Sequence, residues 1–295
     1  AGTQASAEGW VVANPIQLPL FTRHPLQRVN ATLLNRQLRK LCRQYAIRRA
    51  ILFFSTPRYA AAAQLLPWPS VFYFSDAYSR HRELSPAERE YMRWQEDELI
   101  RRSRTVICCS RPILRDVASR GFGTPIVHFP HQVDYERFRA ARQRAAVPDD
   151  LRQIPRPIIG YYGTLTDSND WETVRYAAAR RPNYSFVFIG KKEIADTGME
   201  ALPNVHFLGF RPFEQIPDYG AAFDVAIMFW VRREWIRFCS PLKLKEYLAL
   251  GRPVVSTLIE DVQEEFGDVV DCTETPEAFL AALDARVADP NPRRI

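Results

Sequence analysis

The chain has 295 residues, of which 46% are hydrophobic and 25% are charged, a composition typical of an ordinary globular protein rather than a disordered one. No run approaches the roughly 18 apolar residues of a membrane-spanning helix, and the N-terminus lacks a signal-peptide pattern. The formal net charge of +6 suits an anionic small ligand, an anionic membrane surface or nucleic acid. No zinc-finger spacing, aromatic RNA-binding signature or long basic tail supports nucleic-acid binding.

Short apolar runs alternate with helical patterns along the chain, which is typical of parallel sheets flanked by helices. In the first half we expect helices near 28–47 and 86–104 and strands at 10–13 ("WVVA"), 51–54, 70–75, 105–109 and 126–129. In the second half we expect strands at 158–162, 186–190, 205–209, 224–229, 253–256 and 269–270. The five cysteines have no paired metal spacing, which favours reduced thiols in a cytoplasmic protein.

A segment rich in proline and charge separates the two halves. Residues 145–157, "AAVPDDLRQIPRP", show little periodicity and are interpreted as a linker. We therefore predict an α/β protein of two Rossmann-like, doubly wound domains, residues 1–148 and 149–295. Such domains facing each other place the carboxyl ends of both sheets around a cleft, the usual ligand site of this fold class.

The stretch "SPLKLKEYLALGRPVVST", residues 240–257, has the pattern of a short helix with an unusual charge at its start. Ser240 and Pro241 suit the N-cap and the first helical position, and Gly251 suits the stop. Lys243 then lies in the first turn, at the positive end of the helix dipole, where a cation is normally unfavourable. A bound anion at the helix N-terminus would explain the lysine.

Lys243 and Glu246 are three residues apart and share one face of this helix, whereas Leu244 and Leu248 would pack on the sheet. A phosphate would accept hydrogen bonds from the free backbone N–H groups and from the Lys243 ammonium. The Glu246 carboxylate, one turn further along, would accept hydrogen bonds from a ribose diol. The pattern alone leaves open the alternative of a solvated ion pair between the two side chains.

This stretch resembles the nucleotide-sugar site of GT-B glycosyltransferases, especially bacterial enzymes related to family 4. These often carry Ser-Pro-Leu-Lys, a Glu, and then Gly-(Arg/Lys)-Pro-Val-Val. "FPHQVDYERF" and "PIIGYYGTLTD" are similar to other segments of that family in order and spacing. The resemblance implies a metal-independent enzyme without a cofactor, which moves a sugar from a UDP or GDP sugar to a hydroxyl of a saccharide or lipid-linked acceptor in polysaccharide or glycoconjugate biosynthesis.

Carried over position by position, the resemblance assigns the diphosphate to Ser240, Leu242 and Lys243, and the ribose to Glu246. Lys243 would also offset the negative charge that grows on the leaving diphosphate, an electrostatic contribution of the kind that often dominates catalysis. Retaining members usually have a second glutamate eight residues before Glu246, where this chain has Phe238. Inversion and retention therefore both stay open.

The resemblance also assigns donor contacts to two strand ends. Gly163 and Thr164 would approach the phosphates or the donor sugar, since glycine has no Cβ to block close contact. Leu208, Gly209 and Phe210 would line the pocket for the base. Ordinary turn chemistry is an equal alternative for each of the two glycines.

Asp76 is the candidate general base on the acceptor side, because it follows the strand 70–75 at its carboxyl end. His81, five residues further on, is the second candidate. The alternative is a structural role for Asp76 as a cap or loop carboxylate.

Several basic residues have less specific patterns. Arg232, Arg233 and Arg237 lie in the loop that leads into the helix motif, so one of them is expected near the donor, but the sequence does not identify which. Lys191 and Lys192 are better explained by a solvated loop than by a phosphate. The basic amphipathic helix near 28–47 is either a surface face or a contact with the anionic inner face of the plasma membrane.

The family usually has a strand, a glycine loop and a helix before the region where this chain begins, so we expect an incomplete N-terminal domain. That expectation and Phe238 also support a different class of function, a non-catalytic glycosyltransferase-like partner subunit. A nucleotide-sugar epimerase of the same two-domain fold is a third alternative, for which no motif is found.

Overall fold

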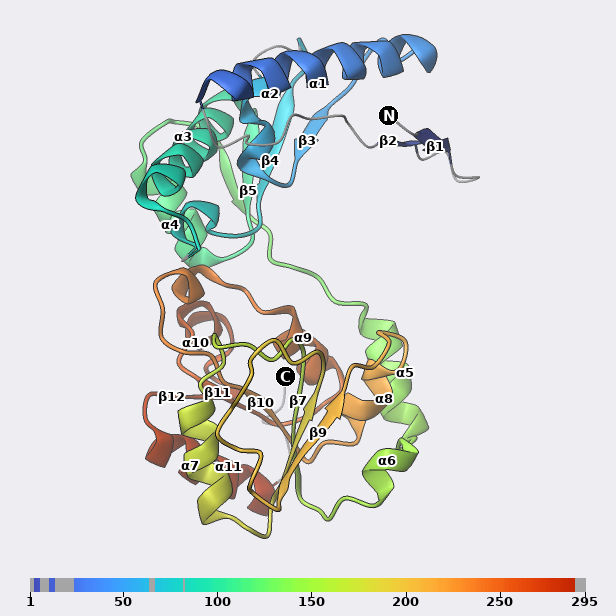
Figure 1. Ribbon diagram of the computed structural model, residues 1–295, viewed down its shortest axis with the longest axis vertical. Coiled ribbons are helices and arrows are strands. Elements are labelled where there is room, and N and C mark those ends of the chain that lie inside the picture. The colour runs from blue at the N-terminus through green and yellow to red at the C-terminus, as the bar shows by residue number, and fades with distance from the viewer. Residues whose placement is uncertain (1–2, 6–10, 14–23, 64–66, 82, 290–295) are drawn as a thin grey trace. The chain divides into compact units, whose positions relative to one another are not determined.

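The computed structural model describes residues 3–5, 11–13, 24–63, 67–81 and 83–289. The chain divides into two units, Ala1–Pro130 and His131–Ile295, each with a parallel sheet of its own (Figure 1). This division comes earlier than the boundary predicted after residue 148. The reason is that α5 (Tyr135–Arg144) packs against α8 (Ile216–Ala221) and α9 (Leu242–Ala249), both of which belong to the second unit.

The first unit contains a four-stranded parallel sheet in the order β3-β4-β5-β6. Its strands are β3 (Leu52–Phe54), β4 (Ser70–Phe74), β5 (Thr105–Cys108) and β6 (Ile126–His128). Its helices are α1 (His24–Gln44), α2 (Ala60–Ala63), α3 (Pro86–Arg102) and α4 (Arg111–Ser119), with 3₁₀ turns η1 (Pro57–Tyr59) and η2 (Tyr78–Arg80). Over the described residues, no helix has the length and apolarity that crossing a bilayer requires.

Local sequence explains where the helices of this unit begin. Ser85 caps α3 and forms a capping box with Glu88, so each side chain bonds the backbone N–H of the other residue. Ser110 caps α4 by accepting a hydrogen bond from the N–H of Ile113. The predicted strand at 10–13 is the exception to the parallel pattern. It forms β2 (Val11–Ala13), which among the described strands pairs with β1 (Thr3–Ala5) alone, in antiparallel register.

The second unit contains a six-stranded parallel sheet in the order β12-β11-β10-β7-β8-β9. Its strands are β7 (Ile158–Tyr162), β8 (Ser185–Ile189), β9 (Val205–Gly209), β10 (Val225–Met228), β11 (Val254–Thr257) and β12 (Val270–Thr273). Besides α5, α8 and α9, its helices are α6 (Asp149–Arg152), α7 (Trp171–Arg180), α10 (Glu260–Phe266) and α11 (Pro276–Ala288), with the 3₁₀ turn η3 (Trp235–Phe238).

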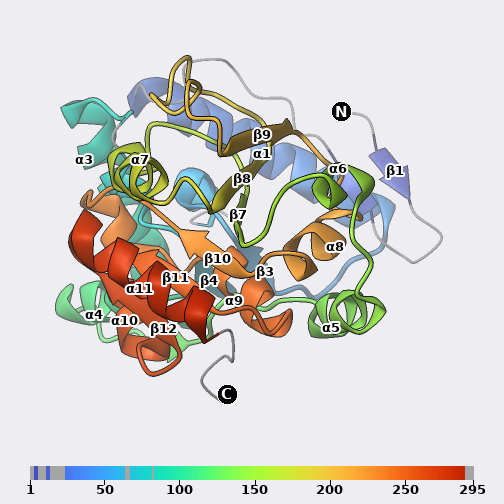
Figure 2. The ribbon, with the colours of Figure 1, turned by 90° about the horizontal axis from the view of Figure 1, so that it is seen from below.

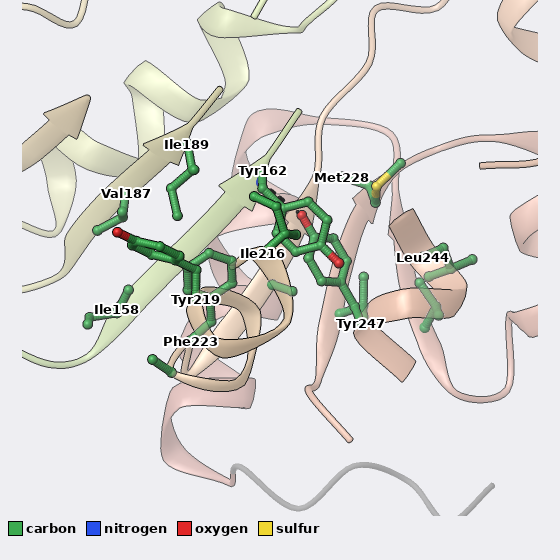
Figure 3. Packing of buried hydrophobic residues seen from close by; sticks show 14 of the residues in the cluster. Ile158, Tyr162, Val187, Ile189, Ile216, Tyr219, Phe223, Met228, Leu244 and Tyr247 are labelled. Carbon is green, nitrogen blue, oxygen red and sulfur yellow. Dashed lines mark hydrogen bonds between the residues drawn. The ribbon is translucent and has the colours of Figure 1, made fainter. Parts of the chain in front are cut away.

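Helices cover both faces of this sheet, so the central strands are apolar throughout rather than alternating. Ile159 and Tyr161 of β7 belong to the core under α7 and α11. Ile158 and Tyr162 belong to the core under α8 and α9, which Figure 3 shows from close by. Figure 2 shows α7 and α11 on one side of the sheet and α8 on the other.

The segment at 145–157 is not the free linker that its composition predicts. It contains α6, and Leu151 is 1% exposed and Ile154 9% exposed in the core beneath α8 and α9. Two well-spaced apolar side chains thus fix a segment whose proline and charge content suggested a loose connection. The linker interpretation was therefore wrong.

Candidate functional site

The predicted donor residues lie where the order of strands reverses in the second sheet. From β7 the chain proceeds outward through β8 and β9, and from β10 it proceeds the other way through β11 and β12. Because β7 and β10 are neighbours, the loops after them diverge at their carboxyl ends, which is where ligands bind in sheets of this kind. Gly163 and Thr164 follow β7, and Trp230 follows β10.

The helix of the sequence motif is α9, and it begins one residue later than predicted. Its N-cap is Pro241, which makes no side-chain capping bond, so the assignment of the N-cap to Ser240 was wrong. Proline holds an extended conformation there but offers no acceptor for the free N–H groups of the first turn. The stop at Gly251 is confirmed: its φ is +64°, and its N–H donates to the Leu248 carbonyl at 2.8 Å.

The Lys243 side chain lies directly across Gly163. A Cβ at Gly163 would come within 2.2 Å of Lys243 Cε and within 2.8 Å of its Nζ. The ammonium lies 5.4 Å from the ring centroid of Tyr161 and 5.5 Å from that of Trp230, distances at which aromatic faces attract cations. Within the described part of the chain, the ammonium forms no ion pair or hydrogen bond.

A buried tyrosine fixes the position of α9 relative to β7. Tyr247 is fully buried, and its hydroxyl accepts a hydrogen bond of 3.1 Å from the backbone N–H of Tyr162. The two rings also meet edge to face, with centroids 4.7 Å apart (Figure 3). Because Tyr247 lies one turn after Lys243, this contact determines where the lysine leaves the helix.

Glu246 is buried on the same side of the helix, with only 9% of the residue exposed. Burial raises its pKa, while the nearby Tyr162 hydroxyl and the charge of Lys243 oppose the rise. The Tyr162 hydroxyl itself is buried and reaches hydrogen-bond geometry with no described residue. The alternative of a solvated ion pair between Lys243 and Glu246 is therefore wrong. A buried acid with a perturbed pKa beside a lysine is a typical feature of functional sites.

Three glycines link the carboxyl ends of β7, β8 and β9. The φ values of Gly163 and Gly190 are +142° and +145°, and a Cβ on Gly190 would lie 2.0 Å from the Gly163 carbonyl oxygen. The Gly190 N–H donates to the Gly209 carbonyl at 2.9 Å. Packing against the Gly163 backbone thus requires glycine at 190, and the φ of +142° favours glycine at 163, whereas Gly209, at φ +73° with open space around it, is explained by its turn. Ligand contacts at both stay predictions.

The other predicted donor residues are less closely associated with the lysine. Thr164 and Leu242 are exposed, and Phe210 is 70% exposed. Leu208, by contrast, packs against the core beneath α8 and α9. Ser240 is buried in front of α9. A pocket for a nucleobase at these positions therefore stays a prediction.

The loop after β8 carries two lysines that are already paired. Lys191 Nζ lies 2.8 Å from Glu193 Oε1, and Lys192 Nζ lies 2.5 Å from Glu200 Oε1. These pairs agree with the interpretation of a solvated loop.

In the first unit the two candidate bases form a pair. His81 Nε2 lies 2.9 Å from Asp76 Oδ2, and the hydrogen bond to Asp76 raises the pKa of His81 although burial lowers it. Asp76 Oδ1 also accepts a hydrogen bond of 2.8 Å from the N–H of Ala77. Asp76 therefore supports its loop and orients an imidazole at the same time. The sequence did not indicate that the two candidates act together.

Comparison with known proteins agrees with this geometry. Residues 156–289 match the family described as glycosyl transferases group 1. Over 223 residues the chain is 27% identical to the putative teichuronic acid biosynthesis glycosyltransferase TuaH of Bacillus subtilis (strain 168), covering 71% of this chain and 55% of the relative. The chain thus spans just over half the length of that curated relative.

Solved structures share the fold at lower identity. Alr3699/HepE of Anabaena in complex with UDP superposes with a TM-score of 0.67 at 15% identity, covering 91% of this chain and 75% of that one. Sucrose-phosphate synthase of Thermosynechococcus elongatus gives a TM-score of 0.69 at 16% identity, with coverage of 98% and 76%. The predicted α/β fold of GT-B type is thus confirmed, and the match to the group 1 glycosyltransferase family covers the part of the chain that carries Lys243 and Glu246.

Proposed function

We propose that this protein transfers a sugar from a nucleoside-diphosphate sugar, with UDP as the favoured nucleotide, to a hydroxyl of a saccharide or lipid-linked acceptor in polysaccharide assembly. The observation that carries the proposal is the Lys243 ammonium, which pairs with no residue that the structure describes and is held over Gly163 beside the start of α9, where no side chain forms a capping bond. The family match, the relative named for teichuronic acid biosynthesis and the UDP complex of a structural neighbour support it.

In this proposal the free N–H groups of the first turn of α9 and the Lys243 ammonium bind the diphosphate. The Glu246 carboxylate accepts hydrogen bonds from the ribose. As the bond from the anomeric carbon to the diphosphate breaks, the lysine stabilises the charge that develops on the leaving oxygen. The nucleotide sugar is a substrate, and the proposed reaction uses no additional cofactor.

The acceptor hydroxyl forms the new bond to the anomeric carbon and must lose its proton. In an inverting reaction we propose that the proton goes to the Asp76–His81 pair. Both side chains are about one-third exposed, at 33% and 35%. That exposure leaves them open to a substrate while their mutual hydrogen bond fixes their orientation.

Nucleotide binding tests the role of the lysine. Lys243→Met is expected to weaken UDP binding by about 10–100-fold in calorimetry, the equivalent of one lost hydrogen bond between charged groups. Lys245→Met is the matched control, because Lys245 lies on the same helix but donates to the His131 carbonyl at 2.7 Å. Glu246→Gln should weaken UDP more than inorganic pyrophosphate, which has no ribose. Equal UDP affinity in Lys243→Met and the unmodified chain would rule out this site.

The histidine titration tests the Asp76–His81 pair. Asp76→Asn is expected to lower the pKa of His81, measured by NMR, because Asp76 supplies the main stabilisation of the imidazolium. Glu83, whose carboxylate lies 3.9 Å from His81 Nδ1, and Glu96 add smaller contributions of the same sign. Because the pKa of His81 is raised in the folded state, the pair stabilises the folded protein at low pH. This contribution to stability is lost as the pH rises through the raised pKa. An unchanged His81 pKa in the variant would contradict the pairing.

Contact of α1 with the inner face of the plasma membrane stays a proposal, supported by the basic residues along the helix, such as Arg36, Arg39, Lys40 and Arg43. Sedimentation with anionic vesicles would test it, and failure to sediment would exclude it.

A further inference from the structure

A cavity of about 390 Å³ lies in the second unit at the carboxyl ends of β10 and β11. Its volume falls in the usual range of small-molecule sites, roughly 300–1,000 Å³. One wall is the loop between β10 and α9, and the other is the junction of β11 with α10. The cavity is lined by Arg232, Arg233, Glu234, Ile236, Arg237, Leu258 and Glu260.

The charges of the lining are unevenly neutralised. Arg237 Nε lies 2.5 Å from Glu260 Oε1, and Glu234 also interacts electrostatically with Arg237. Glu260 is therefore paired within the lining, and Glu234 lies close enough to Arg237 to help raise its pKa. Arg232 contacts Glu274, outside the lining, at 3.1 Å, but both side chains are more than half exposed. Exposed pairs of this kind contribute little and exchange partners easily.

Arg233 is the least satisfied of the three arginines. Its Nη2 donates to the Asp167 backbone carbonyl at 3.1 Å, and the Asp167 carboxylate is 3.9 Å away. Its Nη1 is buried and has no hydrogen-bond partner among the residues that the structure describes. Buried polar atoms almost always have a partner, so Arg233 has hydrogen-bonding capacity that no described residue uses, and its charge is the least neutralised in the lining.

Two loops join this cavity to the lysine described above. Arg233 bonds the loop that begins at Gly163, since Asp167 is part of that loop. Trp230, two residues before Arg232, lies 5.5 Å from the Lys243 ammonium and exchanges two hydrogen bonds of 2.9 Å with Thr257. Leu258 of the lining directly follows Thr257. The cavity and the proposed diphosphate site are therefore built from the same loops.

We propose that the arginines of this cavity bind the carboxylate of a hexuronic acid, so that the enzyme prefers an acidic sugar as donor or acceptor. The inference rests on the proposed function, because it specifies the sugar of that reaction. The planar fork of arginine matches a carboxylate with two parallel hydrogen bonds. The diphosphate already has the lysine and the start of α9, so the arginines remain for a second anionic group.

Binding of UDP sugars to the full chain tests this proposal. UDP-glucuronate is expected to bind about 10-fold or more tightly than UDP-glucose, which differs only at the carboxylate. Arg233→Met should remove that preference, and Arg233→Lys should restore only part of it, because lysine lacks the fork. Arg144→Met is the control, since Arg144 pairs with Asp218 on another surface of the same unit.

Free glucuronate, added with saturating UDP, identifies the source of the carboxylate. One supporting result is that glucuronate binds in an Arg233-dependent way while the two UDP sugars bind equally. The acidic sugar would then be the acceptor. Equal binding of both UDP sugars together with no glucuronate binding would overturn it. UDP alone reports separately on the proposed function, because its affinity depends on Lys243 and should be unchanged in the Arg233 variants.

Discussion

Replacing Arg120 with alanine is expected to destabilise the first unit by about 3–5 kcal/mol, the usual cost of removing one partner from a buried ion pair. The Arg120 side chain is 3% exposed, and Glu96, which it contacts at 2.9 Å, is completely buried. The same guanidinium contacts Asp97 at 2.8 Å and Asp116 at 2.5 Å. Its loss would leave the buried Glu96 without the cation that it contacts, whereas Asp116 and Asp97 keep contacts with Arg80 and Arg93.

The consequence extends to the candidate base. Glu96 accepts hydrogen bonds from the backbone N–H of Ser79 at 2.8 Å and from its hydroxyl at 2.9 Å. Ser79 lies in η2, the turn that separates Asp76 from His81. Removal of Arg120 should therefore loosen the Asp76–His81 hydrogen bond as well as the fold.

Urea unfolding followed by circular dichroism measures the loss in Arg120→Ala. Arg139→Ala is the control, because Arg139 forms an exposed pair with Glu136 and should cost less than about 1 kcal/mol. Burial already raises the pKa of Glu96, with the charge of Arg120 opposing the rise, so the pKa rises further in the variant. The loss of unfolding free energy in Arg120→Ala should then be smaller at pH 5 than at pH 8, because protonation of Glu96 removes its unpaired charge. A loss no larger than that of the control would contradict the assigned role.

Replacing Gly190 with alanine is expected to cost about 3 kcal/mol and to weaken UDP binding as well. Its φ of +145° lies in a region that other residues rarely adopt, and the new Cβ would lie 2.0 Å from the Gly163 carbonyl oxygen. A backbone atom cannot move aside as a flexible side chain can. Displacement of Gly163 would in turn move the surface on which Lys243 lies.

Gly209→Ala separates the cost of the positive φ from the cost of the contact with the Gly163 carbonyl oxygen. Gly209 also has a positive φ, of +73°, but no atom lies within 4 Å of the position of a Cβ. We expect a cost of about 1 kcal/mol there, against about three times as much at Gly190, by thermal or chemical unfolding. Similar losses at the two positions would show that backbone conformation, and not the contact with Gly163, dominates.

Most of the fold could be predicted because its signals are local. The apolar runs at 158–162 and 205–209 are β7 and β9 with the predicted bounds, and the other parallel strands differ by a few residues at their ends. The errors arose where tertiary contacts outweigh composition. Leu151 and Ile154 anchor a segment whose prolines and charges resemble those of a linker. The first apolar run pairs with another short strand and with neither parallel sheet of the described residues.

The part of the candidate site that lies on one helix could also be predicted from the sequence. Lys243 and Glu246 are three residues apart on one helix, so their common side follows from helical geometry alone. Tyr161, Trp230 and Gly190 were missed, because their contacts with the lysine and with Gly163 depend on which strands are neighbours in the sheet. In the sequence, aromatic residues end β7 and a glycine follows β8, but neither feature predicts which residue it contacts.

The confinement of Lys243 has a consequence for the thermodynamics of ligand binding. A lysine in solvent samples many rotamers, and ordering it on association costs up to about 1.5–2 kcal/mol of entropy. Here Gly163 and the rings of Tyr161 and Trp230 restrict the Lys243 side chain. Much of that entropy is thus already lost on folding, and we expect the ammonium to bind the proposed diphosphate from a preorganised orientation.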